Sequence, residues 1–201
     1  MAAADYMVWD EMKKLVEELN RELKSEIRAP GFKPKPSSGR LSLFINLGCH
    51  TALRVSDLLR LSWDAVLTNG SCRKVLVLKE KKTGKTRKIP LHEDVRKHVN
   101  WYYKNFGSPG YVFKNRNGDP VSDTFMRAEM TRLKKRKKIR VNNFSTHTLR
   151  KTWAHHVWEK AEGDAMVFEM MSMALNHSST KMTRIYLGIT DKEISKLYLT
   201  V

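Results

Sequence analysis

The sequence predicts a mainly α domain with a small antiparallel β-sheet, which is an α+β fold. Apolar residues recur at steps of three or four along several segments, and this is the period of an amphipathic helix. Two short runs, residues 74–79 and 86–91, carry valine, leucine or isoleucine and flank a Thr83-Gly84 turn, so they indicate one hairpin. With 201 residues, of which 41% are hydrophobic, the chain can bury a sizeable core.

The N-terminal part is expected to be helical apart from one loop. From about Asp5 to Ile27 the apolar residues follow one helical face, and Asp5 is placed to cap that helix. Residues 29–39 hold three prolines and two glycines, which predicts a loop or linker. The segment from Arg40 to about Thr51 is typical of a mostly buried helix, and Ser56 is placed to cap the short leucine-bearing helix that follows.

The middle of the chain is expected to alternate helices with turns. We expect a helix from His92 to about Phe106, a short strand at residues 111–113 and a turn over residues 115–120. Ser122 is placed to cap a further helix, which runs to about Lys138.

The end of that further helix is strongly basic. Seven of the nine residues from Arg132 to Arg140 are Lys or Arg, and the net charge of the whole chain is +17. Such a surplus favours a polyanion as partner, with nucleic acid ahead of an anionic membrane. Contacts to the DNA backbone are therefore predicted for Arg132, Lys134, Lys135, Arg136, Lys137 and Lys138.

The C-terminal part is expected to hold three more helices and a tail. Thr146 is placed to cap a helix that runs to about Glu162, and residues 164–175 form a methionine-rich apolar helix whose methionines are expected in the core. Ser178 or Ser179 can cap the last helix. Residues 191–201 are partly apolar, and this tail could pack on its own domain or on a neighbour's.

Several features point to a cytoplasmic protein without a metal. Cys49 and Cys72 lack the spacing of metal ligands, so buried free thiols in a reducing compartment are expected. The first ten residues do not resemble a signal peptide, and no apolar run reaches the roughly 20 residues needed to cross a bilayer. His92 and His98 are expected on the surface, and no cofactor is expected.

The chemistry-bearing residues have the character of a site for a negatively charged group. Arginines offer permanently charged planar forks that match phosphate oxygens, and a tyrosine offers an oxygen nucleophile. We therefore interpret the candidates as a phosphate-attacking tyrosine with its helpers, and the substrate as DNA. The hairpin by itself does not distinguish Lys82 from Lys79, Lys81 or Lys85. The candidate residues are Arg54, Lys82, His147, Arg150, His177 and Tyr186, with Asp57 in support.

Together these pieces resemble the catalytic domain of the tyrosine recombinases, also called the phage integrase family. The matching pieces are residues 52–61, residues 82–85 leading to 89–91, residues 147–152, residues 175–179, and Tyr186. The nine-residue step from His177 to Tyr186 fits the family pattern. Asn176 departs from it, because it stands where the family usually has glycine. Asparagine is the next most tolerant residue for a left-handed backbone, so a small effect is expected.

The resemblance implies one catalytic domain over residues 1–201. Its expected parts are a first helix (5–28), a loop (29–39), the catalytic core (40–187) and a C-terminal tail (188–201). The N-terminal DNA-clamping domain usual in the family is expected to be absent from this chain, which is then either a fragment or a minimal version of such a protein. The partner is expected to be double-stranded DNA, with a homotetramer on DNA and a monomer in isolation.

The implied reaction passes through a 3′-phosphotyrosine intermediate and needs neither metal nor ATP. Arg54 and Arg150 would hold the scissile phosphate, and His177 would add a hydrogen bond. His147 would accept the tyrosine proton, and Lys82 would protonate the departing 5′ oxygen. Asp57 would brace the arginine or its helix.

Two other functions remain open from the sequence. One is a DNA-binding regulator that keeps the fold without cleaving, and the other is a type IB topoisomerase-like enzyme that nicks and reseals one strand. A hydrolytic nuclease is disfavoured, since the sequence offers no acidic metal site.

Overall fold

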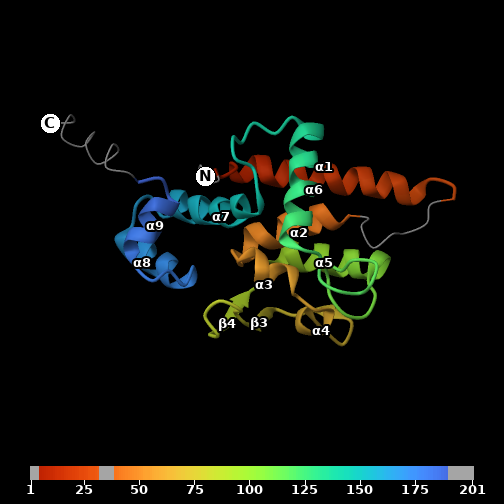
Figure 1. Cartoon of the computed structure of the whole chain (residues 1–201), viewed down its shortest axis with the longest axis horizontal. Coiled ribbons are helices and arrows are strands. Elements are labelled where there is room, and N and C mark those ends of the chain that lie inside the picture. The colour runs from red at the N-terminus through yellow and green to blue at the C-terminus, as the bar shows by residue number, and fades with distance from the viewer. Residues whose placement is uncertain (1–4, 32–38, 190–201) are drawn as a thin grey trace.

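The computed structural model describes residues 5–31 and 39–189 and is mainly helical, with two small antiparallel sheets (Figure 1). The elements are α1 (Trp9–Arg28), α2 (Arg40–Thr51), α3 (Val55–Leu59), α4 (Trp63–Val66), β1 (Leu67–Thr68), β2 (Ser71–Cys72), β3 (Val75–Lys79), β4 (Thr86–Pro90), α5 (Glu93–Phe106), α6 (Asp123–Lys137), α7 (Thr146–Lys160), α8 (Ala165–Ala174) and α9 (Thr180–Tyr186). The predicted α+β class is confirmed.

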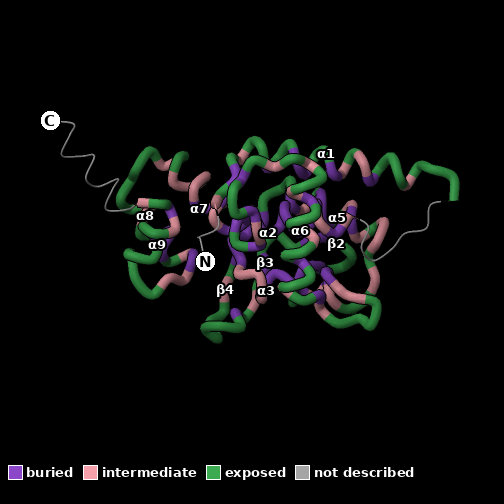
Figure 2. Tube along the Cα trace, turned by 45° about the horizontal axis from the view of Figure 1, so that its top comes forward, coloured by how far each residue is buried: buried purple, intermediate pink, exposed green. Residues whose placement is uncertain are grey.

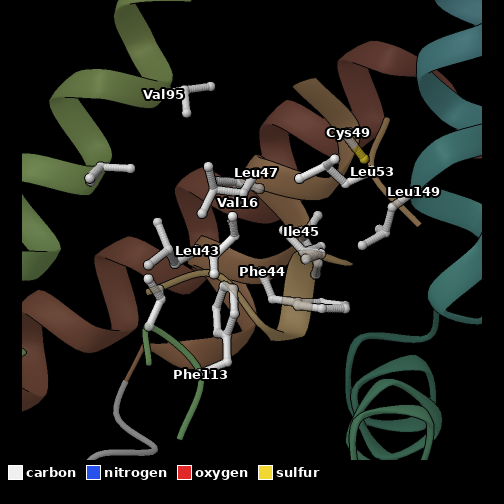
Figure 3. Packing of buried hydrophobic residues seen from close by; sticks show 14 of the residues in the cluster. Val16, Leu43, Phe44, Ile45, Leu47, Cys49, Leu53, Val95, Phe113 and Leu149 are labelled. Atoms are coloured by element: carbon white, nitrogen blue, oxygen red, sulfur yellow. The ribbon is translucent and has the colours of Figure 1, made fainter. Parts of the chain in front are cut away.

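Helix α2 is the centre of the core. Nearly all of its residues are buried, as expected for a helix that is apolar on most sides. It contacts α1, α5 and α7, and Figure 3 shows Leu43, Ile45 and Leu47 among side chains from those helices. At Gly48 an added Cβ would lie 2.6 Å from the Leu149 side chain, so glycine lets α7 approach closely. Because α2 ends beside α3 and α7, its packing positions the segments that carry Arg54 and Arg150.

Some predicted helix caps are wrong. Asp5 lies upstream of α1, which begins at Trp9 after Val8 in the N-cap position. Ser56 lies inside α3, because Arg54 already has the extended backbone of an N-cap residue.

The cap of α7 is displaced by one residue from the prediction. Ser145, rather than Thr146, accepts from the amide of His147 and forms a capping box with Thr148. At α6 the prediction is confirmed, since Ser122 accepts from the amide of Phe125 at 3.1 Å.

The predicted hairpin is confirmed. Strands β3 and β4 pair from Val75 opposite Pro90 to Lys79 opposite Thr86, and residues 80–85 form the loop between them. A second hairpin, β1–β2, was not predicted, although its turn carries the Asn-Gly signal: Asn69 and Gly70 have φ of 49° and 73°. The predicted strand at residues 111–113 is reduced to an isolated bridge, because Tyr111 pairs with Ser62 alone.

Helix α8 contradicts the expectation that its methionines lie in the core. Met166, Met170 and Met173 are 71%, 59% and 79% exposed, whereas Met171 is buried. The helix packs on α7 and α9 at one end of the molecule, so its remaining face is left in solvent (Figure 2). The tail predicted over residues 191–201 lies outside the described residues.

Histidine and cysteine burial gives one correction and one confirmation. His98, expected on the surface, is 8% exposed and lies 2.9 Å from the Asn46 amide through its Nδ1, and burial lowers its pKa to about 4. Cys49 and Cys72 are buried and free, as predicted. No helix within residues 5–31 or 39–189 is long and apolar enough to span a membrane.

Candidate active site

A pocket of about 580 Å³ gathers all six predicted residues from distant parts of the sequence. They come from the start of α3, the β3–β4 loop, the start of α7, the α8–α9 turn and the end of α9. The residues are Arg54, Lys82, His147, Arg150, His177 and Tyr186. The positions where the sequence resembles a recombinase therefore face one shared cavity.

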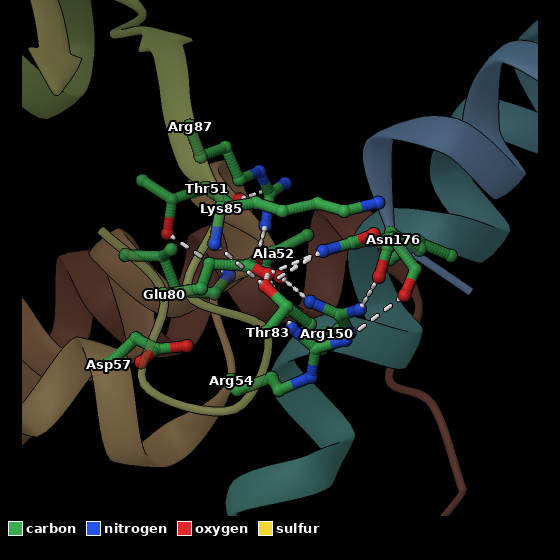
Figure 4. A network of polar contacts seen from close by, with 12 residues as sticks. Thr51, Ala52, Arg54, Asp57, Glu80, Thr83, Lys85, Arg87, Arg150 and Asn176 are labelled. Carbon is green, nitrogen blue, oxygen red and sulfur yellow. Dashed lines mark hydrogen bonds and ion pairs between the residues drawn. The ribbon is translucent and has the colours of Figure 1, made fainter. Parts of the chain in front are cut away.

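Arg150 forms the floor of this pocket. It is 5% exposed, and its two terminal nitrogens donate to the carbonyl oxygens of Ala52 and Leu175 (Figure 4). The α7 helix thus holds together the end of α2 and the end of α8. Burial lowers the pKa of Arg150 to about 10, so the guanidinium keeps its charge at neutral pH.

Arg54 is also held through both of its terminal nitrogens, by a carboxylate and a carbonyl oxygen. Its Nη1 donates to Glu80 Oε2 at 2.7 Å, and its Nη2 donates to the carbonyl oxygen of Asn176 at 3.1 Å. The carboxylate of Glu80 is thus the anion beside Arg54 within the protein.

Glu80 was not predicted. It is 1% exposed and accepts hydrogen bonds from Arg54, Thr83 and Asn176, with Arg87 at 3.4 Å. Burial alone would raise its pKa, but the bonds from Asn176 and Thr83 and the charge of Arg54 outweigh burial and lower the pKa to about 2. The available signal was a single acid within the basic stretch 79–88.

Asn176 has the left-handed backbone that its place in the family pattern predicted, with φ of 50°. Its side chain does something the sequence did not indicate. The amide donates to Glu80 Oε2 at 2.7 Å and to Thr83 Oγ1 at 3.1 Å. A glycine here would keep the turn and lack both bonds.

His177 and Tyr186 lie side by side, with ring centroids 5.1 Å apart. The His177 Nδ1 is 2.9 Å from Thr183 Oγ1, which fixes the ring orientation. Burial, with the charges of Arg150 and Arg54, lowers the pKa of His177 to about 4, so the ring is neutral at pH 7.

Tyr186 is a weak nucleophile in this state. Burial raises the pKa of its phenol, and the charge of Arg150 offsets only part of that increase. The Lys151 ammonium lies 5.6 Å from the ring centroid and adds a further positive charge near the phenol. A phenol in this state would need a base to act as a nucleophile.

His147 lies at the pocket edge, in the first turn of α7. Partial burial and the charge of Arg127 lower its pKa, so its imidazole is neutral at pH 7 and can accept a proton. Arg127, a pocket residue that was not predicted, comes from α6 and is held by Asp123 through Nε at 2.9 Å. Asp123 also accepts from Thr146 at 3.2 Å and so connects α6 to the start of α7.

The hairpin lysines face different cavities. Lys82 and Thr83 line the pocket that holds Tyr186, whereas Lys85 lines a neighbouring cavity of about 710 Å³. Lys79 and Lys81 line a third cavity of about 190 Å³. This placement favours Lys82 among the lysines that the sequence left open.

Of the two roles expected for Asp57, bracing the arginine or bracing its helix, the hydrogen bond seen in the structure fits the second. Its Oδ1 accepts from the backbone amide of Lys81 at 2.8 Å, so it fastens the hairpin loop to α3. Its buried Oδ2 has no hydrogen-bond partner among the described residues.

The basic end of α6 is partly engaged within the protein. The Lys137 ammonium bonds to Glu18 at 2.7 Å and to Glu22, both on α1, and Arg136 lies 3.5 Å from Glu22. Lys137 therefore connects the end of α6 to α1. Other members of the predicted group also have partners: Arg132 pairs with Glu129, and Lys134 donates to the Asn142 carbonyl. Lys135 and Lys138 are exposed, and their DNA contact stays a prediction.

Comparison with known proteins places the chain in a family. Residues 6–193 match the phage integrase family. Over 159 residues the chain is 31% identical to the probable integrase/recombinase YoeC of Bacillus subtilis (strain 168), covering 78% of this chain and 81% of YoeC. Over 172 residues it is 28% identical to the tyrosine recombinase XerC of Bacillus pumilus (strain SAFR-032), covering 82% and 54%.

The fold has a solved counterpart in the XerH site-specific recombinase bound to palindromic difH substrate, a post-cleavage complex. The two agree with a TM-score of 0.68 at 19% identity, over 98% of this chain and 53% of XerH. The chain thus matches about half the length of XerC and of XerH.

Among the described residues no group of three or more His, Cys, Asp or Glu could hold a metal ion. From the extent of the family match and the likeness to YoeC, the chain belongs to the phage integrase family, the tyrosine recombinases.

Proposed function

We propose that this chain is a site-specific DNA recombinase that cleaves and rejoins strands through a 3′-phosphotyrosine intermediate. The observation that carries the proposal is the shared pocket of two arginines, a lysine, two histidines and a tyrosine. Each residue type has a distinct use in phosphoryl transfer, and together they supply a nucleophile, proton carriers and positive charge.

Arg54 and Arg150 are assigned to the non-bridging oxygens of the scissile phosphate. A guanidinium carries more N–H donors than the two that Arg54 gives to Glu80 and Asn176. Arg150 donates to two carbonyl oxygens and also bonds Tyr186, which still leaves donors for a substrate. Both side chains are held before substrate arrives, which stabilises developing charge without reorganisation. His177 adds a neutral hydrogen-bonding ring next to the nucleophile.

In the cleavage step the Tyr186 oxygen forms a bond to phosphorus, and the bond from phosphorus to the 5′ oxygen breaks. His147 accepts the phenol proton as general base, and Lys82 donates a proton to the departing 5′ oxygen. One phosphodiester is replaced by another ester, so the 5′ hydroxyl of a second strand can reverse the step without ATP.

Double-stranded DNA is the proposed substrate. The net charge of +17 favours a polyanion, and XerH was solved bound to its difH substrate. A homotetramer assembled on DNA is the proposed working form. The exposed Lys135 and Lys138 are proposed to contact the DNA backbone.

The test is covalent capture of DNA. A pool of nicked duplexes with randomised cores is incubated with the protein, and DNA that survives denaturing detergent is recovered and sequenced. The expected result is an enriched site and a phosphonucleotide adduct on Tyr186 by mass spectrometry, both absent from Tyr186→Phe. Adduct at the level of Tyr186→Phe would contradict the enzyme and leave a DNA-binding regulator. Relaxation of plasmid DNA without pairing of two sites would indicate a topoisomerase.

A further inference from the structure

The carboxylate of Glu80 connects four separate segments around the pocket. Its donors are Arg54 before α3, Thr83 in the hairpin loop, Arg87 on β4 and Asn176 in the α8–α9 turn. Figure 4 shows these side chains converging on the carboxylate. A buried charge with several donors fixes its partners strongly, because a donor that moves away loses its own bond and leaves the buried carboxylate less well compensated.

Arg54 is oriented by this contact. One terminal nitrogen is bound to Glu80, and the other is bound to the Asn176 carbonyl, so the guanidinium plane is fixed from two directions. Charge-assisted bonds of this kind are about twice as strong as neutral ones. An arginine fixed in this way does not have to search for its position when a phosphate arrives.

Asn176 extends the same network across the pocket. Its side chain joins the hairpin loop, which carries Lys82, to the turn that leads into His177. The residue makes three contacts: its carbonyl accepts from Arg54, and its side-chain amide donates to Glu80 and to Thr83. The hairpin loop and the α8–α9 turn are therefore connected through the carboxylate of Glu80 and the side-chain amide of Asn176.

The network carries an electrostatic cost. Glu80 places a negative charge beside the arginine that is assigned to the phosphate, and like charges repel. For DNA affinity alone, an uncharged residue would serve better at this position. An acid is favourable here when the gain in cleavage rate from an oriented Arg54 exceeds the loss of DNA affinity caused by repulsion.

We propose that Glu80 is a positioning residue that orients Arg54. Through Asn176 it also fixes the loop that carries Lys82 relative to the turn that carries His177. This arrangement favours cleavage and lowers DNA affinity. The proposal rests on the recombinase function proposed above.

Three variants separate orientation from charge. Glu80→Gln keeps the shape and can place its carbonyl oxygen where Oε2 accepts three bonds, while it removes the charge. Glu80→Ala removes both. Asn176→Gly tolerates the left-handed backbone and removes the side-chain amide alone. Glu169→Gln, at an exposed position on α8, is the matched control for loss of one negative charge.

Single-turnover cleavage is measured on the duplex recovered by covalent capture, and the duplex Kd is measured in a Tyr186→Phe background. We expect Glu80→Ala to lower the cleavage rate about 100-fold, the effect of misplacing a reacting group by about 1 Å. Glu80→Gln and Asn176→Gly should lose less, about tenfold. Kd should be tighter in both Glu80 variants, and an unchanged Kd would contradict the proposed cost in DNA affinity. Glu169→Gln should leave rate and Kd unchanged.

The motion of the Arg54 side chain can be measured without DNA, so it tests the role of Glu80 independently of the proposed recombinase function. The ¹⁵N resonances of the Arg54 guanidinium should show slow rotation of the terminal groups in wild type and faster rotation in Glu80→Ala. Arg54 motion that is the same in wild type, Glu80→Ala and Glu80→Gln would overturn the proposal, whether or not any variant cleaves DNA. So would parallel losses of rate, affinity and thermal stability in Glu80→Gln, since these indicate a merely structural residue. If Glu80→Ala does not fold, Glu80→Gln and Asn176→Gly decide.

Discussion

Gly48→Ala tests the close approach of α2 and α7. The added Cβ would lie 2.6 Å from Leu149 Cδ1, 3.0 Å from Leu149 Cβ and 3.2 Å from Leu58 Cδ2. Leu149 and Leu58 are 3% and 1% exposed, so neither has room to move away. Overpacking in such a core costs about 1–3 kcal/mol. Alanine also stabilises a helix by about 1 kcal/mol relative to glycine, which offsets part of this cost.

The net expectation is a loss of about 1 kcal/mol in the free energy of unfolding. In a chain of about 200 residues this lowers Tm by roughly 2–4 °C. Urea unfolding measures the change, with an unaltered m-value showing that the unfolded state is the same. Cleavage should also fall, because Leu149 precedes Arg150 and any shift of α7 moves that guanidinium.

Leu149→Ala provides the control through a double-mutant cycle. By itself it costs about 2–5 kcal/mol, because it leaves a cavity. Combined with Gly48→Ala it should cost less than the sum, since the new methyl group enters space that Leu149 has vacated. A Gly48→Ala variant that is more stable than wild type, with costs that simply add, would refute the argument from close packing.

Further predictions concern the pocket and the basic end of α6. Arg150→Lys should lower the cleavage rate by about 10²–10³-fold, because an ammonium cannot serve Ala52, Leu175 and a phosphate together; single-turnover kinetics measure this, and a loss below tenfold would contradict it. The pKa of His147 is lowered from its ordinary 6.5, so the neutral base form persists below pH 6.5 and is lost only at more acidic pH. The cleavage rate should therefore fall at acidic pH, and His147→Gln should abolish this dependence. An unchanged fall in that variant would exclude His147 as the base. Lys137→Gln should lower stability by about 0.5–1 kcal/mol and leave DNA affinity unchanged, whereas a weaker salt dependence of DNA binding with unchanged stability would restore the predicted phosphate contact.

Local patterns predicted much of the fold. The bounds of α2 and the β3–β4 hairpin followed from apolar runs and turn residues that lie within a few positions of one another. The six pocket residues were found because each belongs to a short motif with its own neighbours. Their convergence on one cavity could be expected only through the family resemblance, since spacing in sequence says little about distance in space.

The features that were missed depend on contacts between distant segments. Glu80 carries no local sign of its importance, because its partners Arg54 and Asn176 lie 26 and 96 positions away. Lys137 has the same difficulty, since its partners on α1 are more than 100 positions distant. The methionines of α8 were misplaced for a related reason: an apolar composition shows that a helix can be buried, but its neighbours decide which side is covered.

The exposed face of α8 has a chemical consequence. Thioethers at Met166, Met170 and Met173 are open to dissolved oxidants, whereas Met171 is shielded. Oxidation would convert these side chains to polar, chiral sulfoxides and change the wetting of that end of the molecule, yet it would not touch the cavity that holds Tyr186. Handling under peroxide-free conditions therefore preserves the native surface there. In a preparation treated with peroxide, the mass gain should map to those three positions first.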